Sequence, residues 1–257
     1  MGDMKLVRAL QSQGFGSRKA CTVRIRAGEV AVNGTLCDDP EADVDTAGLE
    51  LTLDGVSWAY RAQAYVLMHK PVGYECSHHP SHHPSVFSLL PPLLLQRGVQ
   101  CGGRLDQDTS GLLLFSDDGQ FIHRMISPKK GVAKVYRARC AEDVTDAMLD
   151  ALRSGVQLND TPVPVAALAC DRLDATTLRL TLAEGKYHQV KRMIGATGNR
   201  VVALHREAVG HYLLPADLPP GNWRWLEPAD LTQLEQPWQS ATSGGGAIRA
   251  CWRRRAR

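Results

Sequence analysis

Long apolar runs, aromatic residues and paired cysteines are all scarce in this chain of 257 residues. No apolar run approaches the roughly 20 residues that a helix needs to cross a bilayer. The opening residues, MGDMKLVRALQ, lack the apolar core of a secretory signal. The seven cysteines include no C-x-x-C pair, which disfavours a disulfide framework or a zinc site and favours reduced thiols. We therefore expect a cytoplasmic protein without a membrane partner.

The composition otherwise suits a folded globular protein. Hydrophobic residues make up 44% of the chain and charged residues 22%, which is ordinary for globular domains. The length allows one or two domains with a hydrophobic core. Because aromatic residues make up only 6%, a tyrosine or tryptophan inside a motif carries more weight than usual.

The net charge of +3 is distributed unevenly along the chain. Basic residues predominate up to Cys37, the following stretch to residue 55 holds seven acids and no base, and the final AIRACWRRRAR holds five arginines and no acid. A basic head and a basic tail indicate either a polyanionic partner or solubilising termini. Charge alone does not choose between these two interpretations.

The first 60 residues predict a small module of two helices and a sheet. Helical spacing runs over 5–13 and ends at Gly14, and Ser17 is a suitable N-cap for a second helix over 18–27. EVAVNGTLC then predicts a hairpin with an Asn-Gly turn, and LELTLDGVSW predicts another strand with an Asp-Gly turn.

The segment GFGSRKACTVRIRAGEVAVNG carries a resemblance to a known fold. Over about residues 4–57 the module resembles the S4 RNA-binding fold. It departs from that family at one point, since Lys5-Leu6-Val7 stands where the family opens with Arg-Leu-Asp. The resemblance implies that the second helix binds RNA phosphates, unless its basic side chains form only a solvated face. The RNA-binding residues expected on this helix are Arg18, Lys19, Arg24 and Arg26.

A second domain is expected over residues 61–235. Strand patterns occur at 65–70, 111–116, 134–140, 161–170, 176–185 and 201–209, and helical patterns at 119–126, 145–154 and 187–197. Since these elements show no regular βαβ rhythm, they predict an α+β fold with a mixed, mainly antiparallel sheet. Residues 236–257, which are rich in Gly and Ser and then in Arg, are expected to form a flexible tail.

The segment GGRLDQDTSGLLLFSDDG, residues 102–119, places two aspartates beside an arginine. Asp106 and Asp108 at D-x-D spacing could hold a divalent metal, act as an acid/base pair or cap a turn. Three further motifs help to decide: HKPVGY at 69–74, KVY at 134–136 and EGKYHQVKRM at 184–193.

In this order, and after an S4-like module, the four motifs resemble the pseudouridine synthases of the RsuA branch. The family signature G-R-L-D-x-x-T-x-G-L-L is matched from Gly103 to Leu113. YHQVKR and the downstream LHREAVG are more similar to the small-subunit rRNA enzyme than to the large-subunit branch, which tends to show N-R-Q-V-R-R.

This resemblance implies catalytic roles for three residues, each of which also has a structural alternative. Asp106 would act on the uridine ribose, and Lys191 would keep its carboxylate ionised despite burial. Tyr136 would stack on the target base and help to move the C5 proton. The alternatives are a turn acid for Asp106, a surface lysine for Lys191 and a core tyrosine for Tyr136.

Two arginines are expected to bind the substrate. Arg104 would hold the flipped nucleotide or its phosphate, unless it pairs with a local carboxylate. Arg192 lies about 100° round the helix from Lys191, so that only one of the two should face Asp106. Asp108 is expected to be a turn residue, because the family does not require an acid at that position.

No metal or cofactor is expected. The run SHHPSHHP at 77–84 supplies four histidines, but its prolines break helical i, i+4 geometry, so we do not expect it to form a ligand set. No glycine-rich phosphate loop is present. A D-x-D glycosyl transferase would need a βαβ rhythm that the sequence does not show.

The function expected is therefore isomerisation of one rRNA uridine to pseudouridine by a monomer, with uridine 516 of 16S rRNA as the target. The alternatives are a 23S rRNA synthase and a non-catalytic ribosome assembly factor. The sequence does not say whether free RNA or a ribonucleoprotein particle is the substrate.

Overall fold

The computed structural model describes residues 2–236, so the predicted tail falls almost entirely outside the described residues. The chain divides into two compact units. The first contains residues 1–64, 90–100 and 116–118, and the second contains 65–89, 101–115 and the chain from 119 onward. Among the described residues, no helix is both long and apolar enough to cross a membrane.

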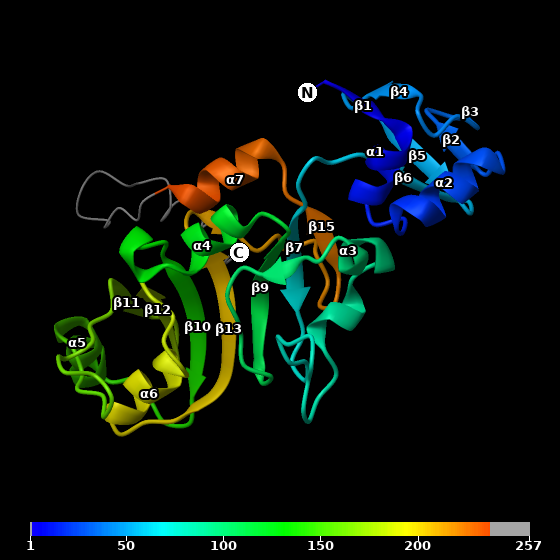
Figure 1. Ribbon diagram of the computed structural model, residues 1–257. Helices are drawn as coiled ribbons and strands as arrows, with labels where there is room; N and C mark the ends of the chain where they lie inside the picture. Colours follow the sequence, from blue (N-terminus) through cyan, green and yellow to red (C-terminus); the bar gives the residue numbers. More distant parts are fainter. Residues whose placement is uncertain (1, 237–257) are drawn as a thin grey trace. The chain divides into compact units, whose positions relative to one another are not determined.

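The first unit contains short helices and strands (Figure 1), and their apolar side chains form one core. Ser17 caps the second helix as predicted, because its Oγ accepts a hydrogen bond from the backbone N–H of Ala20 at 3.2 Å. The predicted Asn-Gly turn also forms, with φ 49° at Asn33 and 81° at Gly34. Its elements are β1 (Asp3–Lys5), α1 (Leu6–Ser12), α2 (Arg18–Arg26), β2 (Val30–Val32), β3 (Thr35–Leu36), β4 (Asp43–Asp45), β5 (Glu50–Leu53) and β6 (Val56–Ala59). The sheet order is β3-β2-β5-β6, with β1 and β4 paired separately.

The first unit extends beyond the predicted boundary at residue 60 by taking in two later segments, one of which carries α3 (Pro92–Gln96). The reason is a buried arginine. The side chain of Arg97 is 1% exposed, pairs with Asp117 at 2.6 Å and donates to Gln13 Oε1 at 2.8 Å. Gly14 adds a close approach, since a side chain at this position would collide with the carbonyl of Leu93. Neither contact was expected from local sequence patterns.

The second unit is built on a nine-stranded sheet whose main path runs β11-β12-β10-β13-β9-β7-β15, with β14 beside β13 and β8 beside β9. Strand β10 pairs antiparallel with β12 and β13, as do β11 with β12, β13 with β14 and β7 with β15, whereas β13 and β9 are parallel. This confirms the predicted α+β fold with a mainly antiparallel sheet. The strands are β7 (Tyr65–Lys70), β8 (Gln100–Cys101), β9 (Thr109–Ser116), β10 (Lys134–Cys140), β11 (Ala169–Arg172), β12 (Thr177–Leu182), β13 (Val201–Val209), β14 (Tyr212–Leu213) and β15 (Trp223–Trp225).

Helices cover parts of this sheet (Figure 1). Residues of α4 and α7 share one apolar cluster with β7, β9 and β13, and α6 contacts both α5 and β13. The helical elements are the 3₁₀ turns Val86–Leu89 and Pro128–Lys130, α4 (Gly119–Ile126), α5 (Asp146–Ser154), α6 (Gln189–Ala196) and α7 (Pro228–Glu235).

The strand predicted over 161–170 is wrong for most of its length. Only an isolated bridge between Val156 and Val165 forms there, and β11 begins at Ala169. Pro162 and Pro164 lack the N–H groups that a strand interior needs, so the segment does not extend the sheet.

Candidate active site

The loop that carries Asp106 lies between β8 and β9 and is held from beneath by a buried lysine. Lys70, at the end of β7, is 0% exposed. Its Nζ donates to the carbonyl oxygens of Pro71 and Asp106 at 3.0 Å each and of Thr109 at 2.9 Å, with Gln107 O at 3.4 Å. Burial lowers the pKa of Lys70, because the charged form loses water. The four carbonyls fix the backbone of the loop around one ammonium group.

Lys191, on α6, faces the carboxylate of Asp106. Its Nζ lies 2.9 Å from Asp106 Oδ2 and 2.6 Å from Asp108 Oδ1, so that one cation serves two acids. Burial works to lower the pKa of Lys191, but the hydrogen bonds to Asp108 and Asp106 outweigh it and leave that pKa raised. For Asp108, burial acts to raise the pKa and the bond from Lys191 overcomes it, so that the pKa is lowered. Both acids are thus held beside a firmly charged ammonium.

Arg192 points elsewhere. Its Nη1 donates to Asp160 Oδ2 at 3.1 Å and to the carbonyl of Tyr187 at 3.2 Å, and its Nη2 pairs with the same aspartate. It does not line the cavity that contains Asp106. Of the two neighbouring basic residues, Lys191 is therefore the one placed at the aspartate.

A small cavity of about 70 Å³ brings the other predicted residues together. Tyr136, which is 7% exposed on β10, lines it with Asp106 and Lys191. Arg104 lines it too and has no ion-pair partner within residues 2–236, so the predicted alternative of a local carboxylate is not seen. The remaining lining residues are Leu105, Thr109, Leu182, Gly185, Lys186, His188, Gln189, Val190 and Leu204.

Sequence reasoning missed His188, which precedes α6 and lies at the same carboxylate. Its Nε2 is 3.3 Å from Asp106 Oδ1, so that the two oxygens of the aspartate face different partners. The backbone of His188 is left-handed, with φ 47°, a conformation that costs a residue other than glycine about 1 kcal/mol. The position inside YHQVKR was a signal, but the ring's direction depends on this backbone conformation.

Lys70 and Arg206 were also missed. Lys70 belongs to HKPVGY and Arg206 to LHREAVG, so both lay inside quoted motifs without an assigned role. Arg206 is 3% exposed and its Nε donates to Leu112 O at 2.8 Å. Its Nη2 and the nearby strand's Thr109 Oγ1 find no hydrogen-bond partner among the described residues.

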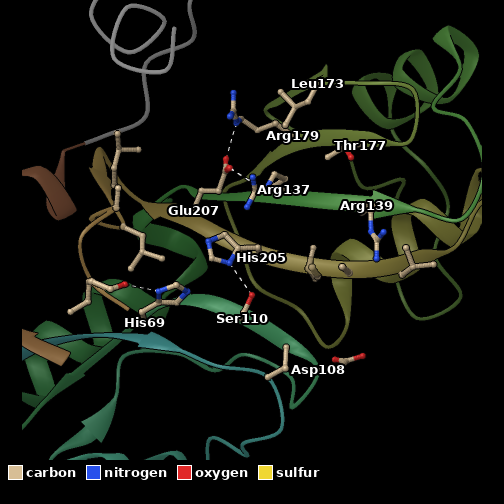
Figure 2. Close-up of a pocket in the computed structure, with 18 of the residues that line it drawn as sticks. His69, Asp108, Ser110, Arg137, Arg139, Leu173, Thr177, Arg179, His205 and Glu207 are labelled. Carbon is tan, nitrogen blue, oxygen red and sulfur yellow. Dashed lines mark hydrogen bonds and ion pairs between the residues drawn. The ribbon is translucent and has the colours of Figure 1, made fainter. Parts of the chain in front are cut away.

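A larger cavity, of about 1010 Å³, lies against the other face of β10. Because side chains alternate along a strand, Arg137 and Arg139 project away from the side that Tyr136 occupies. Figure 2 shows Arg137 beside Glu207, and Ser110 Oγ bonded to His205 Nδ1 at 2.8 Å. The three lining arginines are balanced by three acids, Asp108, Asp174 and Glu207. This cavity contains none of the predicted catalytic residues.

The histidine-rich run is held by an acid and shows no ligand geometry. Glu75 accepts hydrogen bonds from the backbone N–H groups of Ser81, His82 and His83, which lower its pKa. His78 stacks on Phe87, with ring centroids 3.7 Å apart. Within the part of the chain that the structure describes, no group of three or more His, Cys, Asp or Glu could hold a metal ion.

The basic residues predicted on α2 differ in availability. Arg24 pairs with Glu29 and Asp54, so its charge is already neutralised. Arg18 is exposed and lies 3.7 Å from Glu41. Lys19 and Arg26 are exposed, and neither has an ion-pair partner among the described residues. These two are the α2 cations most available to a polyanion.

Comparison with known proteins gives a consistent family. A family model described as RNA pseudouridylate synthase matches residues 64–196. The chain is 36% identical over 237 residues to the Bacillus subtilis protein named Uncharacterized RNA pseudouridine synthase YtzG, covering 91% of this chain and 99% of that one. It is 35% identical over 237 residues to the Ribosomal small subunit pseudouridine synthase A of Escherichia coli K12, covering 90% and 100%. A solved structure titled "Crystal structure of pseudouridylate synthase" superposes with a TM-score of 0.63 at 31% identity, covering 90% of this chain and 99% of that chain. The chain therefore belongs to the RNA pseudouridylate synthase family, isomerases that act on RNA.

Proposed function

We propose that this enzyme converts a uridine of small-subunit ribosomal RNA to pseudouridine, with Asp106 as the catalytic residue. The observation that carries the proposal is the fixed carboxylate: Lys70 holds the backbone of the Asp106 loop, and Lys191 holds one carboxylate oxygen at 2.9 Å. Support for the RNA class comes from relatives named for the small subunit, which match at about 35% identity over almost their whole length.

The reaction is an isomerisation, so every atom of the uridine is retained. The bond between C1′ and N1 breaks, the uracil turns, and a new bond joins C1′ to C5, while the C5 proton is lost and N1 becomes protonated. The ionised carboxylate of Asp106 acts at the ribose, since it is the anion that faces the cavity. Lys191, whose Nζ lies 2.9 Å from this carboxylate, supplies its counter-charge.

The other residues of the cavity bind and orient the nucleotide. A base in a folded RNA must leave its stack to reach a cavity of this kind, and the buried ring of Tyr136 offers the face on which it would stack. Arg104, which has no ion-pair partner among the described residues, would hold the phosphate or ribose of the flipped nucleotide. Arg192 would act indirectly, through its bond to the Tyr187 carbonyl.

The N-terminal unit would supply RNA affinity, as an S4-like module over residues 1–60 that precedes a catalytic domain over 61–235 in the chain. Its support is the order of two helices and a small sheet, together with the exposed cations Lys19 and Arg26. Phosphate contacts of this kind position RNA without taking part in the chemistry. We place the enzyme in the cytoplasm with its ribosomal substrate, acting as a monomer.

The test is to map pseudouridine in ribosomal RNA from cells with and without this gene. We expect one small-subunit position, uridine 516, to lose its modification in the deletion strain and regain it with the wild-type gene. A loss confined to large-subunit RNA would contradict the small-subunit target. Unchanged pseudouridine in both RNAs would contradict the rRNA substrate altogether.

A further inference from the structure

The side chain of Tyr187 is an exposed aromatic ring at the edge of the active site. It is 72% exposed, although aromatic residues are few in this chain. One face of the ring is covered by the imidazole of His188, with ring centroids 3.9 Å apart and planes 17° from parallel. A ring that is stacked on one side and largely exposed to solvent leaves its other face available to a further flat group.

The stacked pair is positioned by the same contacts that build the site. His188 lines the active-site cavity and lies 3.3 Å from Asp106, so Tyr187 stands one residue outside the cavity. The Tyr187 carbonyl accepts a hydrogen bond from Arg192 at 3.2 Å, which holds the backbone of this turn in place. The left-handed φ of 47° at His188 separates the turn from α6. The pair therefore stands beside the cavity, with His188 next to Asp106 and the Tyr187 carbonyl bonded to Arg192.

We propose that Tyr187, stacked on His188, is a second nucleobase site, which takes an unpaired RNA base adjacent to the target uridine. This proposal rests on the proposed function. Unstacked bases of single-stranded RNA are commonly recognised by stacking on aromatic side chains, and an aromatic face accepts any of the four bases. When the target uridine flips into the cavity, its neighbour loses a stacking partner, and Tyr187 replaces it.

Two cations flank the ring, and each is already paired with an acid. Lys186 lines the cavity and lies 3.0 Å from Glu184, whereas Arg192, which donates to the Tyr187 carbonyl, pairs with Asp160. An RNA phosphate would have to compete with these acids, so the exposed ring itself carries the recognition.

The experiment uses full-length enzyme and a small-subunit rRNA fragment centred on uridine 516, with 2-aminopurine placed in turn on each side of the target. Stacking should quench the fluorescence at one of the two positions in wild-type and Tyr187→Phe complexes, but not in Tyr187→Ala or Tyr187→Leu complexes. The two latter variants should bind the unlabelled fragment about tenfold more weakly, within the range found when a base loses an aromatic partner. Leucine keeps apolar area without a flat ring, so it separates stacking from simple hydrophobic contact.

An abasic fragment provides the matched control. Without the base at the quenched position, wild type and Tyr187→Ala should bind equally. Two results together overturn the site: Tyr187→Ala binds the complete fragment as tightly as wild type does, and the wild-type complex shows no quenching at either labelled position. Pseudouridine formation by the wild-type enzyme is measured on the same fragment. If the wild-type enzyme forms no pseudouridine there, the proposed function is overturned, and the site with it.

Discussion

Lys70→Met should reduce activity although Lys70 does not line the active-site cavity. Methionine has nearly the length of lysine but no donor, so the carbonyl oxygens of Pro71, Asp106 and Thr109 lose the ammonium that lies within 3.0 Å of each. The loop that carries Asp106, the proposed catalytic residue, would then have to rearrange or admit water.

The expected magnitude follows chiefly from the carbonyls of Pro71 and Thr109, because Asp106 O keeps a hydrogen bond from the Thr109 backbone N–H at 3.0 Å. A buried acceptor without a donor costs about 1–3 kcal/mol, and rearrangement of the loop recovers part of the sum. We expect the free energy of unfolding to fall by about 3–5 kcal/mol, as when one partner of a buried charged pair is removed. For a chain of this size, that lowers the melting temperature by about 10 °C. In protein that still folds, a loop displaced by about 1 Å should reduce kcat about 100-fold.

Lys134→Met is the matched control, because it makes the same substitution at a second buried lysine. Lys134 is 7% exposed and has no hydrogen-bond or ion-pair partner among the described residues. Burial, with a smaller contribution from Arg206, lowers its pKa from 10.5 to about 8. Since one pKa unit corresponds to about 1.4 kcal/mol, the substitution should stabilise the fold at neutral pH by up to about 3 kcal/mol.

The assay is chemical unfolding of both variants across pH, with single-turnover kinetics beside it. Lys134 should make wild-type stability rise between pH 8 and 10.5, because the unfolded chain keeps the Lys134 proton that the folded chain has lost. Lys134→Met should weaken that rise, and the part that remains should include Lys70, whose pKa burial also lowers. Equal destabilisation by the two substitutions would refute the reasoning. So would a stable Lys70→Met protein with wild-type kcat.

Three further predictions concern other charges. Lys191→Met should reduce kcat about 100-fold, because it removes the cation that stabilises the carboxylate of Asp106. Arg192→Met should change kcat little, since Arg192 pairs with Asp160 instead. Equal effects of the two substitutions in single-turnover assays would contradict this difference. Replacing Lys19 and Arg26 by alanine should flatten the slope of log K against log salt by about 1.5 units, and unchanged slopes in filter binding would mean that α2 does not contact RNA. Burial, followed by the charge on Arg137, lowers the pKa of His205 from 6.5 to about 4. The free energy of unfolding should therefore fall as the pH drops from 6.5 to about 4, because in that range only the unfolded chain takes up the proton. His205→Gln should weaken that fall in acid unfolding, and an unchanged pH profile would exclude this histidine as its source.

Much of the fold follows from local rules that act within a few residues. Ser17 caps a helix and Asn33-Gly34 makes a turn because each depends on its own backbone. The predicted α+β fold with a mainly antiparallel sheet also forms, since its strand and helix periods are distinct. The strand expected over 161–170 does not form over most of its length, because Pro162 and Pro164 lack the N–H groups that a strand interior needs, whatever the alternation of the side chains.

The site was predictable as a set of residues but not as a geometry. The motifs indicate Asp106, Tyr136 and Lys191, and the structure places all three at one cavity. The choice between Lys191 and Arg192 depends on how α6 begins, at a left-handed His188 that periodicity does not reveal. Full burial of Lys70 is equally hidden, because a lysine at a strand end usually reaches solvent.

The central claim is that Asp106 carries out the chemistry, while its neighbour Asp108 only shares the charge of Lys191. The most direct measurement is single-turnover formation of pseudouridine by Asp106→Asn and Asp108→Asn proteins, with RNA affinity measured in parallel. Asp106→Asn should bind RNA nearly as wild type does and form no product. Asp108→Asn should keep a rate within about tenfold of wild type, since the family resemblance requires no acid at that position and loss of an exposed ion-pair partner has a small effect. An Asp106→Asn enzyme with a rate near that of wild type, or an inactive Asp108→Asn enzyme beside an active Asp106→Asn one, would contradict the account.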